Sequence, residues 1–223
     1  MKIRPSVCFI LLGLLLVLLF AADLLLGSVS LAAGEVVRVL TGHSSDPQAT
    51  TLVTHFRLPK AVSAIVVGAA LSASGLQMQT LFRNPLAGPY VLGISSGASL
   101  GVSLFLLGAP LLGISFASEA LRNVGIVGSA WIGGALILLV IMAVSARLKD
   151  IMAILILGMM FGSAASAVVQ ILQYLSTDSA LKSFVIWTMG SLGGVSLAQL
   201  GLMSGIVRAG LRLSVFLIKP FNL

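Results

Sequence analysis

The sequence predicts an all-α fold, a polytopic membrane helical bundle with about six transmembrane helices in a single domain over residues 1–223. Two observations support this prediction. Hydrophobic residues make up 58% of the chain and charged residues only 9%, whereas a soluble domain carries about 25% charged residues. Several stretches of about 20 or more residues also lack charged side chains, which is enough for a helix to cross the hydrocarbon. The composition excludes an ordinary soluble enzyme, a disordered chain and a free nucleic-acid binder.

The charge-free stretches locate the crossings in order. The first, 5–22, is longer than the ~7–15 residues of a signal-peptide core, so we expect a retained helix. The polar segment 27–56 is expected to be an outer loop with a short helix around 31–40. Prolines break the long uncharged run 84–118, and glycines at 190, 193 and 194 separate a short outer helix from the last crossing. The expected spans are about 7–26, 61–82, 90–108, 124–146, 151–175 and 197–218.

Basic residues near the span ends predict the orientation in the cytoplasmic (inner) membrane. With the N-terminus inside, eight Lys and Arg residues lie on the cytoplasmic side and five lie outside. The cytoplasmic set is Lys2, Arg4, Arg83, Arg147, Lys149, Arg208, Arg212 and Lys219, and the outer set is Arg38, Arg57, Lys60, Arg122 and Lys182. A multi-pass protein with a cytoplasmic N-terminus is therefore expected.

Two glycine patterns predict close helix packing. Gly93, Gly97 and Gly101 recur every four residues in the third span, and Gly158 and Gly162 do so in the fifth. Small residues at this spacing allow two helix backbones to approach closely.

The residue types that hold metals or phosphates are sparse. The two histidines fit no metal-ligand spacing, and the single cysteine, Cys8, cannot form an intramolecular disulfide. No G-x-x-x-x-G-K-[ST] phosphate loop occurs, so we expect this chain to bind no ATP through that motif. We also expect it to bind no metal or other cofactor.

The segment from Arg57 to Gly101 is the most informative part of the sequence. Arg57 and Lys60 flank a proline in the first turn of the second span and fix two cations at its outer end. At the other end, two prolines stiffen the turn 83–89. This turn either connects two helices or holds Asn84 and Leu86 toward a central pathway, and the residues alone leave both interpretations open.

This segment resembles the permease subunits of ABC importers for iron–siderophores, haem and vitamin B12. Their pattern reads approximately RLPR, then a small-residue helix, then RNPLAxPxxLGxxxGA, and the chain matches RLP at 57–59 and RNPLA at 83–87, with the later Pro, LG and GA positions. Lys60 replaces the second arginine. WTMGSLGG at 187–194 and KPFNL at 219–223 resemble two further stretches of the family, so the resemblance covers essentially the whole chain.

The resemblance implies a fold of about ten helices per subunit, of which this chain holds the N-terminal part. It implies a dimer of permease subunits, identical or closely related, with two cytoplasmic ATPases that bind ATP. A substrate-binding protein delivers an iron chelate (siderophore or haem) or cobalamin from the outside. The permease itself is then not an enzyme.

The resemblance also assigns residues. Arg57 and Lys60 map to the basic pair that docks the binding protein. Asn84 and Leu86 map to the cytoplasmic gate, with a second contribution from Ile151 and Met152 at the start of the fifth span.

Two features depart from the family pattern. The chain stops at Leu223, before the remaining spans, so we expect a truncated product, half of a split permease or an incomplete sequence. Arg208 and Arg212 lie in the last span, either reaching toward the cytoplasm or facing the pathway or a missing helix. The alternative functions are a non-transporting truncated fragment or scaffold and, less favoured because Asp23 is the sole acid in or beside a span, a secondary transporter.

Overall fold

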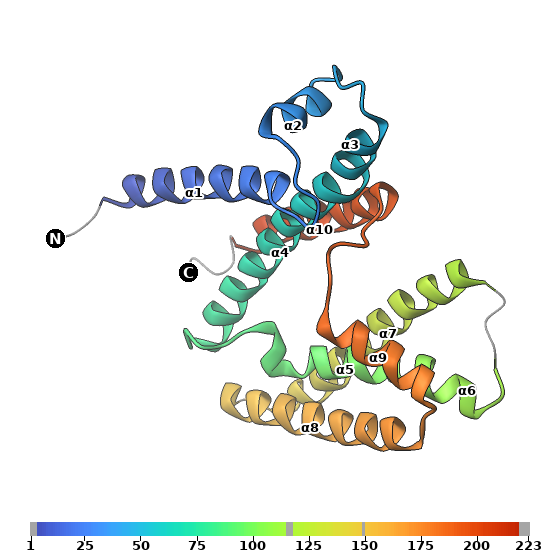
Figure 1. Cartoon of the computed structure of the whole chain (residues 1–223). Coiled ribbons are helices and arrows are strands. Elements are labelled where there is room, and N and C mark those ends of the chain that lie inside the picture. The colour runs from blue at the N-terminus through green and yellow to red at the C-terminus, as the bar shows by residue number, and fades with distance from the viewer. Residues whose placement is uncertain (1–3, 115–117, 149, 219–223) are drawn as a thin grey trace. The chain divides into compact units, whose positions relative to one another are not determined.

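The computed structural model describes residues 4–114, 118–148 and 150–218, and helices account for most of this part of the chain (Figure 1). The chain forms two compact units, the first from Met1–Leu71 with Ser191–Leu223 and the second from Ser72–Gly190. Lys2, Lys149 and Lys219, which the charge pattern assigns to the cytoplasmic side, lie outside the described residues, as does the KPFNL stretch.

Five helical segments of the described residues are long and apolar enough to cross a membrane. They correspond to the first five predicted spans, and the fifth has the predicted bounds. The five are Pro5–Leu25, Pro47–Phe82, Ile94–Leu111, Glu119–Ser145 and Ile151–Leu175. The all-α membrane fold predicted from the sequence is confirmed.

The first unit contains the N-terminal helix and the polar segment 27–56. Its elements are α1 (Pro5–Leu25), α2 (Ala33–Leu40), α3 (Pro47–Thr51), the π-helical segment η1 (Leu52–Arg57), the beginning of α4 (Leu58–Phe82) and α10 (Leu197–Ile218). Asp46 caps α3, since its Oδ1 accepts hydrogen bonds from the backbone N–H groups of Gln48 (2.8 Å) and Ala49 (3.3 Å). Because α3, η1 and α4 follow one another without a break, the predicted second span is the end of a longer helical segment that begins at Pro47.

The polar segment 27–56 packs onto the end of α1 and the start of α4. The short helix predicted around 31–40 is α2, whose Val36 and Val39, one turn apart, are buried. The buried residues of this core are Leu24, Val36, Val39, Ala49, Val53 and Ala61. The core therefore ties three stretches of chain together at the end of α1.

The last predicted span is a helix, α10, over the predicted residues. It carries Arg208 and Arg212, both exposed, and it is not among the five described segments that meet the length and apolarity of a membrane span. Arg208 Nε donates to the Ser204 carbonyl of its own helix (3.1 Å). A sixth crossing by α10 therefore stays a prediction.

The second unit holds the end of α4 and the third to fifth crossings. Its further elements are the 3₁₀ turn η2 (Pro89–Leu92), α5 (Ile94–Ser103), the π-helical segment η3 (Leu104–Gly108), α6 (Ala109–Leu111), α7 (Glu119–Ser145), α8 (Ile151–Leu175) and α9 (Asp178–Met189). The third span was predicted to begin at residue 90, but the helix begins at Ile94. The reason is that Gly93 adopts a left-handed conformation (φ 70°), which separates η2 from α5.

Two clusters of buried residues mark the two ends of this unit. One joins the turn after α4 to the end of α7 and the start of α8 through Phe82, Ala87, Leu92, Ile141 and Leu155. The other joins η3 to the end of α8 and to α9 through Val102, Leu106, Leu107, Val169 and Phe184. The turn 83–88 and the start of α8 therefore lie at the same end of the unit, as the predicted topology requires.

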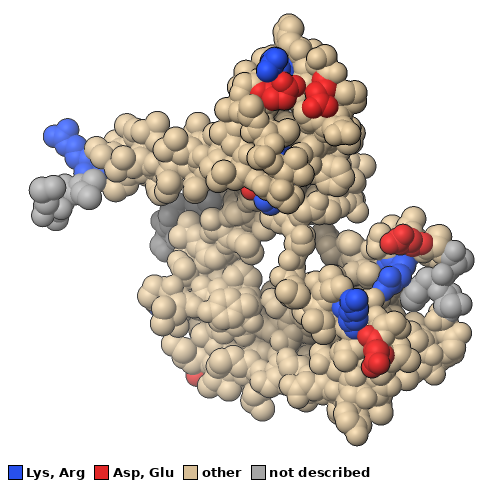
Figure 2. Space-filling model, viewed as in Figure 1, with Lys and Arg blue, Asp and Glu red and all other residues tan. Residues whose placement is uncertain are grey.

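The charged residues that the structure describes in the second unit lie at these ends. Arg83, Arg147 and Asp150 lie at the first end, and Glu119, Arg122, Asp178 and Lys182 lie at the other. Most of the surface visible in Figure 2 is uncharged. An uncharged belt between two charged ends is the pattern of a protein that spans a bilayer.

Candidate functional site

The turn after α4 is held by a defined helix-end motif. Arg83 adopts a left-handed conformation (φ 47°). Its N–H donates to the Thr80 carbonyl (3.3 Å), and the Asn84 N–H donates to the Gln79 carbonyl (3.1 Å). These two bonds form a Schellman motif, which normally places glycine where Arg83 lies. Pro85 follows and prevents the helix from continuing.

Within this turn, Asn84 holds the backbone and Leu86 projects from it. The Asn84 Oδ1 accepts a hydrogen bond from the Leu86 N–H (2.9 Å), and the Asn84 carbonyl accepts one from the Ala87 N–H (3.1 Å). Leu86 is 80% exposed, whereas its neighbour Ala87 is buried against the cluster of Phe82 and Leu155. Asn84 therefore fixes the turn that presents Leu86.

The start of α8 presents two more apolar side chains at the same end. Asp150 caps α8, since its Oδ1 accepts a hydrogen bond from the Met152 N–H (2.9 Å). Ile151 and Met152, in the first turn, are both exposed, while Leu155 one turn later is buried. The four residues of the predicted gate (Asn84, Leu86, Ile151 and Met152) thus lie at one end of the second unit, and their action as a gate stays a prediction.

The glycines singled out by spacing lie at two different helix contacts. Gly93 lies against α8, where a Cβ built on it would lie 2.8 Å from the Gly158 carbonyl oxygen and 3.1 Å from the Gly162 Cα. A Cβ on Gly158 would lie 2.8 Å from the Leu92 Cα. The backbone of η2 and α5 therefore approaches α8 at a distance that excludes any side chain.

Gly97 and Gly101 lie against α7 instead. A Cβ on Gly97 would lie 2.6 Å from the Gly133 carbonyl oxygen, and one on Gly101 would overlap the Ser129 carbonyl. Gly133 completes this contact from the α7 side, opposite both glycines of α5. The four-residue spacing predicts one common face for Gly93, Gly97 and Gly101. In the structure they are divided between α8 and α7, because Gly93 lies before the first residue of α5 and does not follow the helical repeat.

Polar side chains line two adjoining grooves on the second unit. The first, of about 570 Å³, lies between η2, α5 and α8, and the second, of about 380 Å³, between α5, α8 and α9. Ser96, Ser166 and Gln170 line both, and the Ser166 hydroxyl donates to the Ser96 Oγ (3.4 Å) and to the Gly162 carbonyl (2.9 Å). The polar side chains of the two grooves, here called the polar track, are Tyr90, Ser95, Ser96, Ser99, Ser163, Ser166, Gln170, Gln173 and Thr188.

The polar track follows one face of α8. Its members on α8 are spaced by three, four and three residues and line one groove or the other: Ser163, Ser166, Gln170 and Gln173. From Ser163 to Gln173 the helix rises about 15 Å, which is about half of the hydrocarbon thickness. None of these polar residues is among the predicted site residues, although hydroxyl and amide side chains recur at helical spacing in this apolar span of the sequence.

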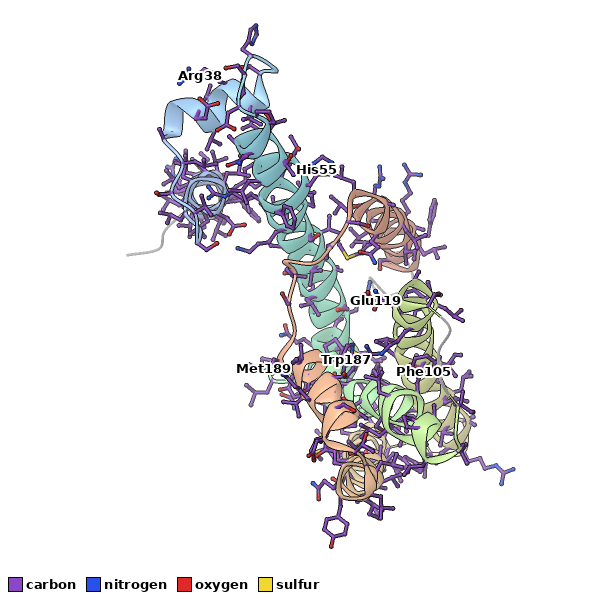
Figure 3. All side chains as sticks on the ribbon, turned by 45° about the vertical axis from the view of Figure 1, so that its right-hand side comes forward. Arg38, His55, Phe105, Glu119, Trp187 and Met189 are labelled. Atoms are coloured by element: carbon purple, nitrogen blue, oxygen red, sulfur yellow. The ribbon has the colours of Figure 1, made fainter. Side chains whose placement is uncertain are left out.

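Aromatic residues close the end of the unit beside α9. The rings of Phe184 and Trp187 stack with centroids 6.0 Å apart. Two further aromatic residues pack against the cluster that contains Phe184. They are Phe105 from η3 and Trp187 from α9 (Figure 3). The WTMGSLGG stretch noted in the sequence therefore begins within a packed helix end that borders the polar track.

The two cations of the RLPK stretch have partners within the first unit. Arg57 is 6% exposed, and its guanidinium donates to the carbonyls of Leu24, Leu25 and Val29. Lys60 forms an ion pair with Asp23 (Nζ to Oδ1, 2.7 Å). The family resemblance predicts that both residues dock a binding protein. The structure shows that the Arg57 side chain is buried, and docking by either residue stays a prediction.

No group of three or more His, Cys, Asp or Glu side chains that could hold a metal occurs among residues 4–114, 118–148 and 150–218. The grooves likewise present hydroxyls and amides, with no charged side chain among the described residues that line them. Hydroxyl and amide side chains in this arrangement can form weak hydrogen bonds with a polar molecule.

We predict that Asn84→Ala destabilises the second unit by about 1 kcal/mol, since the Leu86 N–H loses its acceptor. The Asn84→Asp variant keeps an acceptor oxygen at this position and should stay close to the wild type. The thermal unfolding midpoints in detergent compare the two. Equal losses in both variants would show that the turn does not depend on this bond.

Comparison with known proteins extends these observations. The model of the FecCD transport family matches residues 14–223. The chain is 36% identical to the hemin transport system permease protein HmuU of Yersinia pestis over all of this chain and 64% of HmuU. It is 37% identical to the vitamin B12 import system permease protein BtuC of Escherichia coli O127:H6 (strain E2348/69 / EPEC), over 80% of this chain and 52% of BtuC. The molybdate import system permease protein MolB of Haemophilus influenzae is 33% identical over 81% of this chain and 52% of MolB.

A solved structure gives the same fold. A chain presented as an inward-facing conformation of a metal-chelate type ABC transporter superposes with a TM-score of 0.69 and 30% identity, over 88% of this chain and 57% of that one. The chain thus spans between 52% and 64% of the length of these relatives. With the family model matched across nearly the whole sequence and the permease fold present in the structure, the chain belongs to the FecCD transport family.

Proposed function

We propose that this chain is a transmembrane permease subunit, or the N-terminal part of one, of a binding-protein-dependent ABC importer. The importer moves an iron chelate (siderophore or haem) or cobalamin across the cytoplasmic membrane. The family and the relatives for hemin and vitamin B12 support this assignment. The main structural support is the polar track along α8, because hydroxyl and amide groups that face lipid find no hydrogen-bond partners there.

The polar track is proposed as part of the substrate route. Polar groups at membrane depth lie against water or other protein, since in hydrocarbon each lost hydrogen bond costs free energy. Metal chelates and cobalamin carry many hydrogen-bond acceptors, which serine and glutamine side chains can meet one after another. Because the track holds no charge among its described lining residues, it offers many weak contacts and no single strong one.

Leu86, Ile151 and Met152 are proposed to form the cytoplasmic gate at one end of this route. Exposed apolar side chains at a constriction exclude water until they separate. Asn84 is proposed to act through the turn, since its side chain holds the backbone that presents Leu86. If this gate faces the cytoplasm, the N-terminus lies on the cytoplasmic side as well, because two spans separate it from the turn 83–88.

The proposed partners are a second permease subunit, two cytoplasmic ATPases and an extracytoplasmic substrate-binding protein. ATP is bound and hydrolysed by the ATPases. Lys60 is the better candidate for docking the binding protein, because its side chain is 47% exposed and that of Arg57 is buried. An exposed cation steers an acidic partner and sets its register.

The test is uptake by the assembled importer. The chain, any downstream permease segment and the ATPase encoded in the same genome are reconstituted in proteoliposomes with the cognate binding protein. We expect ATP-dependent uptake of a ferric siderophore, haem or cobalamin that requires the binding protein. An assembled complex that moves none of these substrates and does not couple ATP hydrolysis to the binding protein would favour the non-transporting scaffold.

A further inference from the structure

Arg57 occupies an unusual position for a residue next to a membrane helix. It is the last residue of the π-helical segment η1 and is buried in the core of the first unit, beside Val53 and Leu24. One nitrogen, Nη1, donates to the Leu24 carbonyl (2.8 Å) and the Leu25 carbonyl (3.0 Å). The other, Nη2, donates to the Val29 carbonyl. All three acceptors lie about 30 residues earlier in the chain.

The acceptors are groups that a helix end leaves without partners. α1 ends at Leu25, so the carbonyls of its last turn have no N–H of their own helix to accept from. Leu26 satisfies the Ala22 carbonyl (2.7 Å), and Arg57 satisfies those of Leu24 and Leu25. A cation at this end also opposes the negative end of the helix dipole. The guanidinium thus caps α1 from a distant part of the chain.

The chain leaves room for the guanidinium at Gly27. A Cβ on Gly27 would lie 3.1 Å from Nη2 and 3.3 Å from Cζ of Arg57. Because Arg57 bridges carbonyls on both sides of Gly27, the turn after α1 wraps around the guanidinium. A side chain at residue 27 would push against the guanidinium and shift it by a few tenths of an ångström.

Lys60 contacts the same helix end from one turn further along. Its ammonium pairs with Asp23 in the last turn of α1 (2.7 Å), with side chains 47% and 32% exposed. The two cations of the RLPK stretch therefore converge on residues 23–29, one buried and one at the surface. An exposed pair needs only a point charge, whereas three carbonyls need the planar fork of arginine.

We propose that Arg57 and Lys60 form a two-point clamp on the end of α1. Arg57 is the internal, salt-insensitive anchor that orders residues 24–29. Lys60 with Asp23 is the weaker, surface point. The clamp accounts for arginine at residue 57, which reaches three carbonyls, and for lysine at residue 60, which pairs with one carboxylate.

The test measures local order in the full chain in detergent or nanodiscs. Hydrogen exchange of residues 20–31 is compared among the wild type, Arg57→Gln, Arg57→Lys, Lys60→Arg and Asp23→Asn. Arg38→Gln is the matched control, because Arg38 lies on α2 of the polar segment 27–56, is 63% exposed and pairs only with Glu35 among its recorded ion pairs (Figure 3). Residues 151–175 of the second unit report any global loss of structure.

We expect Arg57→Gln to speed exchange of residues 20–31 about tenfold or more, with little change at 151–175. Arg57→Lys should not restore protection, Lys60→Arg should keep it, and Asp23→Asn should cause a small increase. In 1 M salt the effect of Asp23→Asn should disappear, because the wild-type pair is then screened, while the effect of Arg57→Gln should remain.

Two results would overturn the clamp. One is an exchange rate of residues 20–31 in Arg57→Gln that equals the rate in Arg38→Gln. The other is wild-type protection of the same residues in Arg57→Lys. If Arg57→Gln fails to fold, Gly27→Ala decides, since it crowds the guanidinium and keeps the charge. Faster exchange at 20–31 in Gly27→Ala supports the clamp, and wild-type exchange refutes it. None of these outcomes depends on transport.

Discussion

Replacing Gly133 by alanine should destabilise the protein by about 1–3 kcal/mol, the usual cost of overpacking a close contact. A Cβ on Gly133 would overlap the Gly97 carbonyl oxygen and would lie 2.9 Å from the Gly101 N and 3.0 Å from its Cα. All of these atoms are backbone, so no side chain can rotate away. The α5 and α7 helices would have to separate, and the thermal unfolding midpoint in detergent should fall.

Gly128→Ala is the matched control for this prediction. Gly128 lies on the same helix, α7, and a Cβ there would meet nothing within 4 Å. Alanine is a better helix former than glycine, so Gly128→Ala should be neutral or slightly stabilising. If Gly133→Ala unfolds at the same temperature as Gly128→Ala, the backbone contact between α5 and α7 is not as close as the structure gives it.

The second large effect is expected in the polar track. Ser163→Leu should reduce ATP-dependent uptake by the assembled importer at least about tenfold, because it fills the first groove and removes a hydroxyl. Ala164→Leu is the control, since Ala164 is the next residue of α8, is exposed and lines neither groove. The comparison is made at equal levels of assembled complex. Equal uptake by the two variants would remove Ser163 from the substrate route.

The same pair tests for water in the track without any partner. In a Cys8→Ser background, which removes the single native cysteine, Ser163→Cys and Ala164→Cys are treated with a water-soluble thiol reagent. We expect Ser163→Cys to react faster, because thiolates form where water reaches them. Faster reaction of Ala164→Cys would place the water-facing side of α8 elsewhere.

The crossings illustrate what a sequence read by its charges can predict. The fifth span has the predicted bounds because charged residues end it on both sides and Asp150 caps its start. The third span was placed about four residues too early, since the conformation of Gly93 depends on its contact with α8 rather than on local sequence. The second begins earlier than predicted because polar residues from Pro47 onward continue the helix outside the apolar core.

Some of the site residues could be recognised from the sequence, and others only from the structure. The turn that contains Asn84 and Leu86 was recognisable from its prolines and from a family resemblance, and its backbone bonds follow from those residue types. The role of Arg57 was not recognisable, because the carbonyls that it binds belong to residues about 30 positions away. The polar track was overlooked because each serine and glutamine alone is unremarkable in a helix.

The fold class, the family and five of the six predicted crossings could be inferred from the chain alone, because hydropathy and short motifs are local properties. Three features emerged only from the folded arrangement: the helices that the glycines touch, the polar side chains that join into one track, and the binding of Arg57 to the end of α1. These are contacts between residues distant in the chain, and their free energy depends on distance and burial, which composition and spacing do not contain.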